Sequence, residues 1–145
     1  MLKIDIQKLS PLAMLPKRMT DHAAGYDLFS CHDENITLKK GELYLIPTGL
    51  AISLPIGFEA QIRPRSGLAV KHKIGVLNSP GTIDADYRGE IKIILFNFGD
   101  ENFIIKPQTR IAQMIIAKHE TVEFEIKEQL DDTSRGEGGF GHTAH

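Results

Sequence analysis

The amino-acid sequence predicts an all-β fold, a jelly-roll-like barrel or sandwich with one short helix. Apolar and polar residues alternate with a period of two at residues 2–7, 58–63 and 122–127, which is typical of strands with one buried face. Gly and Pro recur between the apolar stretches, as expected where many short strands are joined by turns. Helical periodicity is nearly absent.

The one helix is expected at residues 66–72, where Ser66 would cap one or two turns. Two runs, at residues 93–96 and 114–117, are apolar on both faces, which indicates either a central strand or a subunit interface. The chain becomes glycine-rich near its end. We therefore expect residues 1–134 to form one β domain and residues 135–145 a mobile C-terminal arm.

Composition narrows the class of protein. The 145 residues suit one domain, and the net charge of −2 argues against binding to nucleic acid or to a membrane surface. It still permits a nucleotide ligand, because a few basic side chains in a cleft suffice for one. Cys31 is the only cysteine, and no apolar run approaches the roughly 18 residues of a membrane span. A cytoplasmic protein with a reduced thiol is expected.

Residues 64–69 are a candidate anion site. Arg65 and Ser66 precede Gly67 at the start of the expected helix, where backbone N–H groups attract anions and an Arg can clamp a phosphate. The alternative is an ordinary turn with a capping Ser and a solvated Arg.

Residues 78–90 indicate a β-hairpin with its turn near residues 85–89 and a following strand from Ile91. Asp84 and Asp86 lie close together there and could bind water or a hydrated metal ion. The alternative is a polar turn without chemistry.

The C-terminal arm is a third candidate site. Its glycines would let backbone amides wrap an anion, and Phe140, between two glycines, would stack on a flat ligand. The alternative is a disordered tail.

Together with residues 24–28 and 110–115, these three segments resemble the five sequence motifs of the dUTP pyrophosphatase (dUTPase) family, in order and with similar spacing. The resemblance covers nearly the whole chain. It implies hydrolysis of dUTP to dUMP and pyrophosphate by attack of water on the α-phosphate, which lowers dUTP and supplies dUMP for thymidylate synthesis. It also implies Mg²⁺ as cofactor and a homotrimer with active sites at subunit interfaces, each closed by the arm of a neighbouring subunit.

The resemblance also implies roles for single residues. Asp84 would orient and deprotonate the attacking water, Arg65 would neutralise phosphate charge, and Asp27 would support a hydrated metal ion that no protein atom binds directly. Tyr87 would pack on the deoxyribose. The implied substrate-binding residues are Arg65, Ser66, Gly67, Asn78, Thr82, Ile83, Asp84, Tyr87, Lys92, Gln113, Arg135, Phe140, Gly141, His142 and Thr143.

The chain departs from the family pattern at its end. The family often has Ser-Thr-Gly after the motif glycine, whereas this chain has His142, Thr143 and Ala144 before it ends. His142 would have to donate the contact that the Ser usually makes.

Three alternative functions compete with this interpretation. A dCTP deaminase shares the fold, but that family has a catalytic Glu where this chain has Ile94, and an aliphatic side chain cannot shuttle protons. A non-catalytic nucleotide-binding protein would be expected to lack Asp84 or the arm. A purely structural jelly roll would have no use for Phe140.

Overall fold

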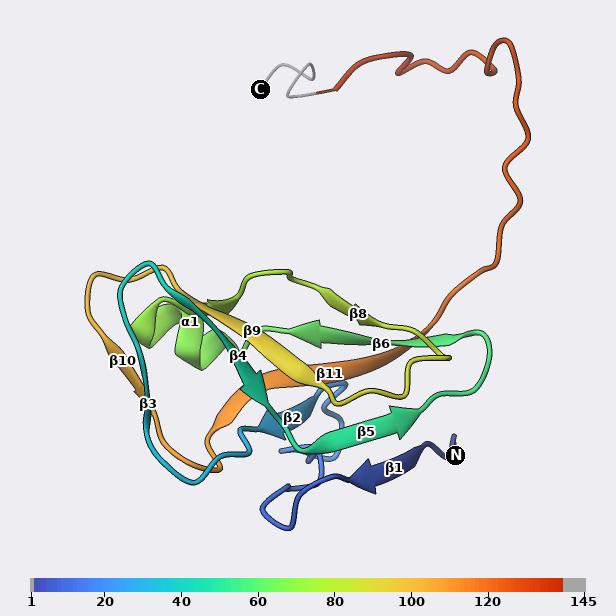
Figure 1. The fold of residues 1–145 in the computed structure, drawn as a ribbon. Helices are drawn as coiled ribbons and strands as arrows, with labels where there is room; N and C mark the ends of the chain where they lie inside the picture. Colours follow the sequence, from blue (N-terminus) through green and yellow to red (C-terminus); the bar gives the residue numbers. More distant parts are fainter. Residues whose placement is uncertain (1, 140–145) are drawn as a thin grey trace.

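A computed structural model describes residues 2–139, in which short strands and one helix form a β sandwich (Figure 1). The elements are β1 (Asp5–Lys8), β2 (Tyr26–Phe29), β3 (Ile36–Leu38), β4 (Leu43–Pro47), β5 (Leu50–Ser53), β6 (Phe58–Arg63), α1 (Ser66–His72), β7 (Ile74–Val76), β8 (Gly81–Ile83), β9 (Lys92–Asn97), β10 (Phe103–Ile105) and β11 (Arg110–Lys118).

Two sheets form the two layers of the sandwich. One has the strand order β2-β11-β6-β8 and the other β4-β9-β7, and all pairings in them are antiparallel. Two smaller sheets, β1-β5 and β10-β3, complete the fold. Within residues 2–139 the strands stay in these separate sheets and do not close into a barrel, so the sandwich form of the predicted fold is the one observed.

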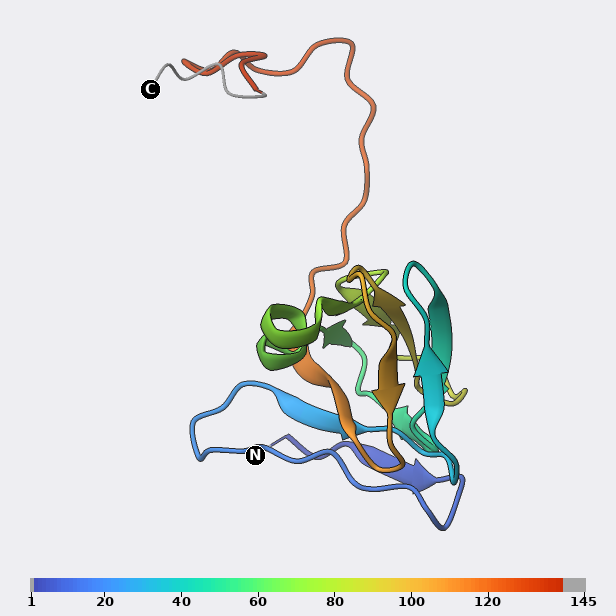
Figure 2. The same ribbon diagram turned by 90° about the vertical axis from the view of Figure 1, so that its left-hand side faces the viewer.

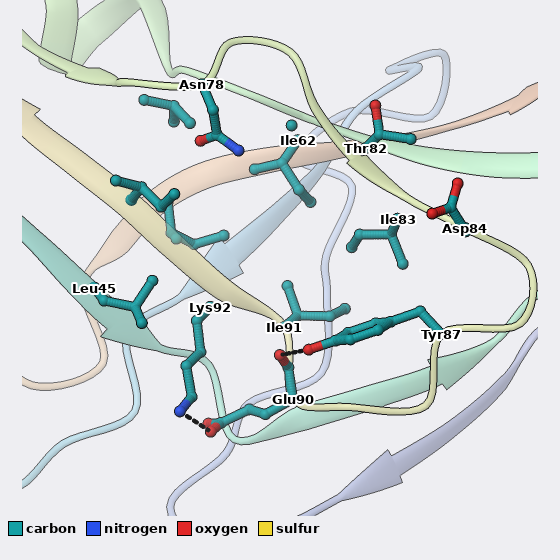
Figure 3. Close-up of a pocket in the computed structure, with 14 residues that line it drawn as sticks. Leu45, Ile62, Asn78, Thr82, Ile83, Asp84, Tyr87, Glu90, Ile91 and Lys92 are labelled. Carbon is teal, nitrogen blue, oxygen red and sulfur yellow. Dashed lines mark hydrogen bonds and ion pairs between the residues drawn. The ribbon is translucent and has the colours of Figure 1, made fainter.

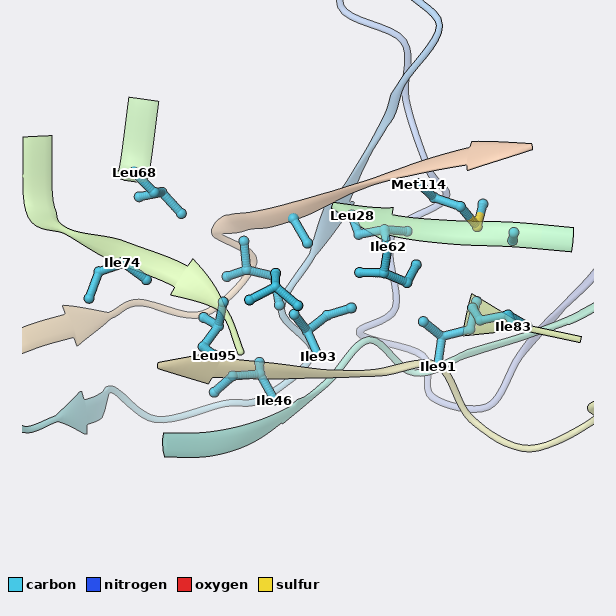
Figure 4. Packing of buried hydrophobic residues seen from close by; sticks show 14 of the residues in the cluster. Leu28, Ile46, Ile62, Leu68, Ile74, Ile83, Ile91, Ile93, Leu95 and Met114 are labelled. Atoms are coloured by element: carbon cyan, nitrogen blue, oxygen red, sulfur yellow. The ribbon is translucent and has the colours of Figure 1, made fainter. Parts of the chain in front are cut away.

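The hydrophobic core lies between the two layers (Figure 4). Figure 4 shows Ile46, Ile93 and Leu95 of one sheet facing Leu28 and Ile62 of the other. All five are at most 5% exposed, so their burial supplies the main driving force for folding. The two runs predicted to be apolar on both faces lie in β9 and β11, which are interior strands of the two sheets.

Helix α1 begins where it was predicted, but Ser66 does not cap it. Arg65 occupies the N-cap position with extended backbone, and no side chain donates or accepts a capping hydrogen bond. Ser66 is already the first helical residue, so its hydroxyl lies within the first turn. Leu68 is the buried residue of the helix and joins the core cluster.

The predicted hairpin at residues 78–90 is wrong in its pairing. β8 pairs with β6, whereas β9 pairs with β4 and β7, so the chain between β8 and β9 crosses from one sheet to the other. The following strand begins at Lys92, one residue later than expected. Alternation in a sequence indicates strands but does not say which strands pair.

The expected half-buried strand at residues 122–127 does not form. After β11 the chain leaves the sandwich and extends away from it in both views (Figures 1 and 2). Val122, Phe124 and Ile126 are 64%, 91% and 97% exposed. A strand needs a hydrogen-bonding neighbour, and none in the described part of this chain pairs with these residues.

The N-terminal strand forms but is less buried than predicted. β1 pairs with β5 in register from Asp5 opposite Ser53 to Lys8 opposite Leu50. Leu2 and Ile6 are nevertheless 47% and 39% exposed, so the described residues do not fully cover the alternating face.

No helix in the described range is both long and apolar enough to cross a membrane. The cytoplasmic location is a separate prediction that this finding does not test.

Candidate active site

A pocket of about 300 Å³ opens where the chain passes from one sheet to the other (Figure 3). It is built by the end of β7, by β8, by residues 84–91 and by the start of β9. Six residues that the resemblance singled out line it together: Asn78, Thr82, Ile83, Asp84, Tyr87 and Lys92. These residues are spread over fifteen positions of the sequence, and the crossing between the sheets brings them to one cavity.

The apolar wall of the pocket comes from residues that sequence reasoning did not assign to it. Leu45, Ile62, Val76, Ile91, Ile93 and Ile94 line it. The apolar run in β9 was the only hint in the sequence of this wall. A strand in the hydrophobic core and a strand that lines a pocket both have such a run of apolar residues. Ile94 contributes an aliphatic side chain to the cavity where a deaminase would need a proton-carrying group.

Asp84 lies at the exposed edge of the pocket. Within the described residues its carboxylate takes part in no hydrogen bond or ion pair with other side chains, while its main-chain oxygen accepts from the Tyr87 N–H at 3.1 Å. A carboxylate with free lone pairs facing a cavity can hold and polarise a water molecule.

Tyr87 is held against the turn that follows it. Its hydroxyl donates to the main-chain oxygen of Glu90 at 3.0 Å. The ring packs over Gly89 so closely that a Cβ there would overlap the Tyr87 hydroxyl oxygen. Glycine at this position leaves room for the ring where it now lies, and the ring presents a flat aromatic surface beside the pocket.

A second group of predicted residues gathers around Asp27 on β2. Its Oδ2 lies 3.1 Å from Nη1 of Arg110 and 3.4 Å from Nε of Arg65. Arg65 also donates from Nη1 to the Arg110 carbonyl at 3.1 Å. The Asp27 side chain is only 13% exposed, and two guanidinium groups offset the cost of burying its charge. Arg110 was not assigned a role from the sequence.

Gln113 on β11 joins this second group. Its Nε2 donates to the Pro64 carbonyl at 3.0 Å, directly before the Arg65–Gly67 segment. Its Oε1 packs against Gly25 and fills the space that a Cβ there would take. Ser66 and Gly67 are exposed at the first turn of α1.

The predicted site residues thus fall into separate groups in the described part of the chain. The residues around Asp27 do not line the pocket that contains Asp84 and Tyr87. Arg135 lies on the extended segment, where its Nε donates to the Gly138 carbonyl at 2.8 Å. Phe140, Gly141, His142 and Thr143 lie outside the described residues.

No cluster of three His, Cys, Asp or Glu side chains suited to a metal ion occurs among residues 2–139. Asp27, the carboxylate predicted to support a metal ion, forms ion pairs with Arg65 and Arg110. Magnesium commonly binds through substrate phosphates and retained waters rather than in a protein cage. The residues present fit a metal ion of that kind.

Comparison with protein families and named proteins gives a consistent result. A family model described as dUTPase matches residues 12–144. The deoxyuridine 5'-triphosphate nucleotidohydrolase of Rickettsia felis is 59% identical over 142 residues, which are 97% of this chain and 96% of that protein. That of Syntrophotalea carbinolica is 51% identical over 140 residues, 97% of this chain and 95% of the relative.

Solved structures with a similar fold include dUTPases from bacteriophages. A point mutant of the phage 80alpha dUTPase superposes with a TM-score of 0.89 at 28% identity, over 97% of this chain and 98% of that one. The 80alpha enzyme with dUPNHPP gives 0.86 at 28% identity, over 99% of both chains. A point mutant of the dUTPase from phage phi11 of S. aureus, described with a structural Mg(II) ion, gives 0.82 at 25% identity over 90% and 100%.

Proposed function

The chain belongs to the dUTPase family, and from this membership we propose how its own residues carry out the family reaction. The protein is a dUTP diphosphatase that hydrolyses dUTP to dUMP and pyrophosphate. The observation that carries the residue assignment is the pocket in which Asn78, Asp84 and Tyr87 lie together.

Asn78 reads the uracil edge, because its amide offers both a donor and an acceptor. Main-chain groups of Thr82, Ile83 and Lys92 complete the base contacts from β8 and β9. Cytosine reverses one donor–acceptor position and would leave buried groups unpaired, at a cost of about 1–3 kcal/mol each. Tyr87 covers C2′ of the sugar and leaves no room for a ribose hydroxyl.

Asp84 performs the proton transfer. Its carboxylate orients a water molecule and takes a proton from it as the water oxygen bonds to the α-phosphorus. The bond from the α-phosphorus to the oxygen that bridges to the β-phosphorus breaks, and pyrophosphate leaves with that electron pair. Dispersal of phosphate charge is the main task left to the protein in such a transfer.

The phosphates are bound by the Asp27 group and by the arm. Arg65, Ser66, Gly67 and Gln113 lie at the start of α1 and beside it, where they offer positive charge and polar donors. Asp27 holds Arg65 in place through its 3.4 Å contact. Arg135, Phe140, Gly141, His142 and Thr143 are assigned to the arm, residues 135–145, which closes over phosphates and base.

Magnesium is the proposed cofactor, and when bound to the triphosphate it neutralises phosphate charge. Mg²⁺ usually keeps several waters and binds through substrate phosphates, which favours its arrival with the nucleotide. Chelation of Mg²⁺ should lower kcat by on the order of 10²-fold or more, since such an ion contributes several kcal/mol. Titration calorimetry of Mg²⁺ into the nucleotide-free protein should show no tight stoichiometric binding, and tight binding would refute this arrangement.

We further propose a homotrimer in which each active site takes residues from more than one copy. The division of the site residues into separate groups within one chain supports this. So do the uncovered side chains of Val122, Phe124 and Ile126, which need a partner that the described part of their own chain does not supply. Light scattering should give the mass of a trimer, and a stable active monomer would exclude shared sites.

Selectivity among nucleotides tests the proposed function. Pyrophosphate release should be measured in parallel from dUTP, dTTP, dCTP and UTP. We expect kcat/KM for dUTP to exceed each of the others by about 10²-fold or more, because each wrong nucleotide leaves a buried group unpaired or meets a steric clash.

The same assay separates the alternatives. Release of ammonia from dCTP without pyrophosphate would indicate a deaminase. Tight binding of dUTP without turnover would indicate a non-catalytic nucleotide-binding protein.

A further inference from the structure

Glu90 has an unusual set of contacts for a residue to which no role in the reaction was assigned. It lines the pocket, and its side chain is 24% exposed. Its Oε1 accepts from the backbone N–H of Gly49 at 2.8 Å, and its Oε2 lies 3.6 Å from Nζ of Lys92. Its main-chain oxygen accepts the Tyr87 hydroxyl at 3.0 Å (Figure 3).

The Gly49 end of this connection is rigid. Gly49 has a φ of +66° in the turn between β4 and β5, and a Cβ there would lie 2.7 Å from Sγ of Cys31 and 2.9 Å from Cβ of Ala13. Its carbonyl accepts from the Leu9 N–H at 2.7 Å. The turn is therefore enclosed by the chain and offers a fixed donor to Glu90.

At the other end of this connection, the ring of Tyr87 lies against the main chain of Glu90. Tyr87 lies in the exposed crossing segment between β8 and β9, and its ring contacts Gly89 and the Glu90 carbonyl. Residues 84 and 86–88 are exposed, and Ala85 between them packs against the core cluster. After the ring, the chain is next attached to the turn at Gly49 by the Glu90 side chain. The neighbouring Ile91 donates from its N–H to the Leu50 carbonyl and accepts at its own carbonyl from the Thr48 N–H and hydroxyl.

We propose that Glu90 is a positioning residue that sets the discrimination between deoxyribose and ribose. By anchoring the end of the crossing segment to Gly49, it fixes the ring of Tyr87 at the distance from the sugar that excludes a 2′-hydroxyl. This inference rests on the proposed function, in which Tyr87 packs on the deoxyribose. The effect requires the length of the side chain and an acceptor atom, not its charge.

Charge provides the competing explanation. Glu90 could instead act by neutralising Lys92, whose side chain is 45% exposed. An exposed ion pair of this kind is worth little in water, whereas a donor left without an acceptor is costly. The geometry therefore favours the hydrogen bond to Gly49.

Three substitutions of Glu90 separate the effect of side-chain length from the effect of its negative charge. Glu90→Gln keeps the length and an acceptor oxygen but removes the charge. Glu90→Asp keeps the charge but is too short to reach the Gly49 N–H. Glu90→Ala removes both, and Glu42→Ala, which breaks only the exposed pair with Lys39, is the matched surface control.

The readout is the ratio of kcat/KM for dUTP to that for UTP, measured beside a thermal melt. Glu90→Ala and Glu90→Asp should each lower this ratio about tenfold, since the lost bond is worth roughly one tenfold step. Their loss with dUTP should appear in KM more than in kcat. Glu90→Gln and Glu42→Ala should keep the ratio within about threefold of the parent.

An unchanged ratio in Glu90→Asp, or a loss in Glu90→Gln with Glu90→Asp intact, would overturn the proposal. If Glu90→Ala fails to fold, the comparison of Glu90→Asp with Glu90→Gln still decides. Absence of dUTP hydrolysis in the parent protein would instead refute the proposed function, so the two failures are distinguishable.

Discussion

Replacement of Asp84 by Asn should lower kcat for dUTP by about 10²–10⁴-fold, the usual contribution of a general base. The amide can still accept a hydrogen bond from water but cannot take its proton. KM should change little, because the carboxylate contacts the water and not the nucleotide. The fold should be unaffected, since the Asp84 side chain is exposed and makes no bond to other described side chains.

Asp86→Asn is the matched control for this substitution. Asp86 is also exposed and lies two residues away, but it does not line the pocket. Steady-state kinetics should show parent-like turnover for Asp86→Asn. Turnover of Asp84→Asn within a few-fold of the parent would remove Asp84 from its assigned role.

Deletion of residues 135–145 should lower kcat by about 10²-fold or more while the melting temperature stays close to that of the parent. Arg135 would meet the transferring phosphates only when the arm is closed, so it would stabilise mainly the transition state. Arginines with this role raise kcat by large factors. The fold should survive because every residue from 118 to 137 is exposed and the segment leaves the sandwich (Figure 1). Steady-state kinetics of the truncated protein tests the expected loss of kcat, and a thermal melt tests the expected stability.

Phe140→Ala separates the stacking contact from the rest of the arm. It should reproduce part of the loss in kcat, with Arg135 still present. Parent-like turnover after the deletion would show that the arm has no part in the reaction. A collapsed melting temperature would show that it is structural.

Much of the fold could be predicted from local patterns. β6 has the predicted alternation, with Ala60 and Ile62 buried, and α1 has the predicted bounds. The pairing of β8 could not be predicted, because alternation identifies a buried face and not a neighbouring strand. The pattern at residues 122–127 was misleading for a related reason: alternation does not say whether a neighbouring strand is available to pair with the segment.

The sequence motifs predicted which residues would lie together, but not the contacts that only the folded chain creates. Asn78, Asp84 and Tyr87 were predicted together and lie in one pocket. Arg110 and Glu90 were not assigned roles, since their contacts join residues 83 and 41 positions apart. The direction in which the Arg110 and Glu90 side chains point is set by tertiary packing, which the spacing of residues in the sequence does not reveal.

We propose that one active site combines the pocket of one copy with the arm of another. Asp84→Asn chains and chains lacking residues 135–145 should be produced together with different affinity tags, and the mixed assemblies purified on both. Each homo-oligomer alone should be nearly inactive. Mixed assemblies should regain dUTP hydrolysis, because the intact Asp84 of a truncated chain would meet the intact arm of its neighbour. Mixed assemblies as inactive as their parents would contradict the account, since the arm would then serve only its own chain.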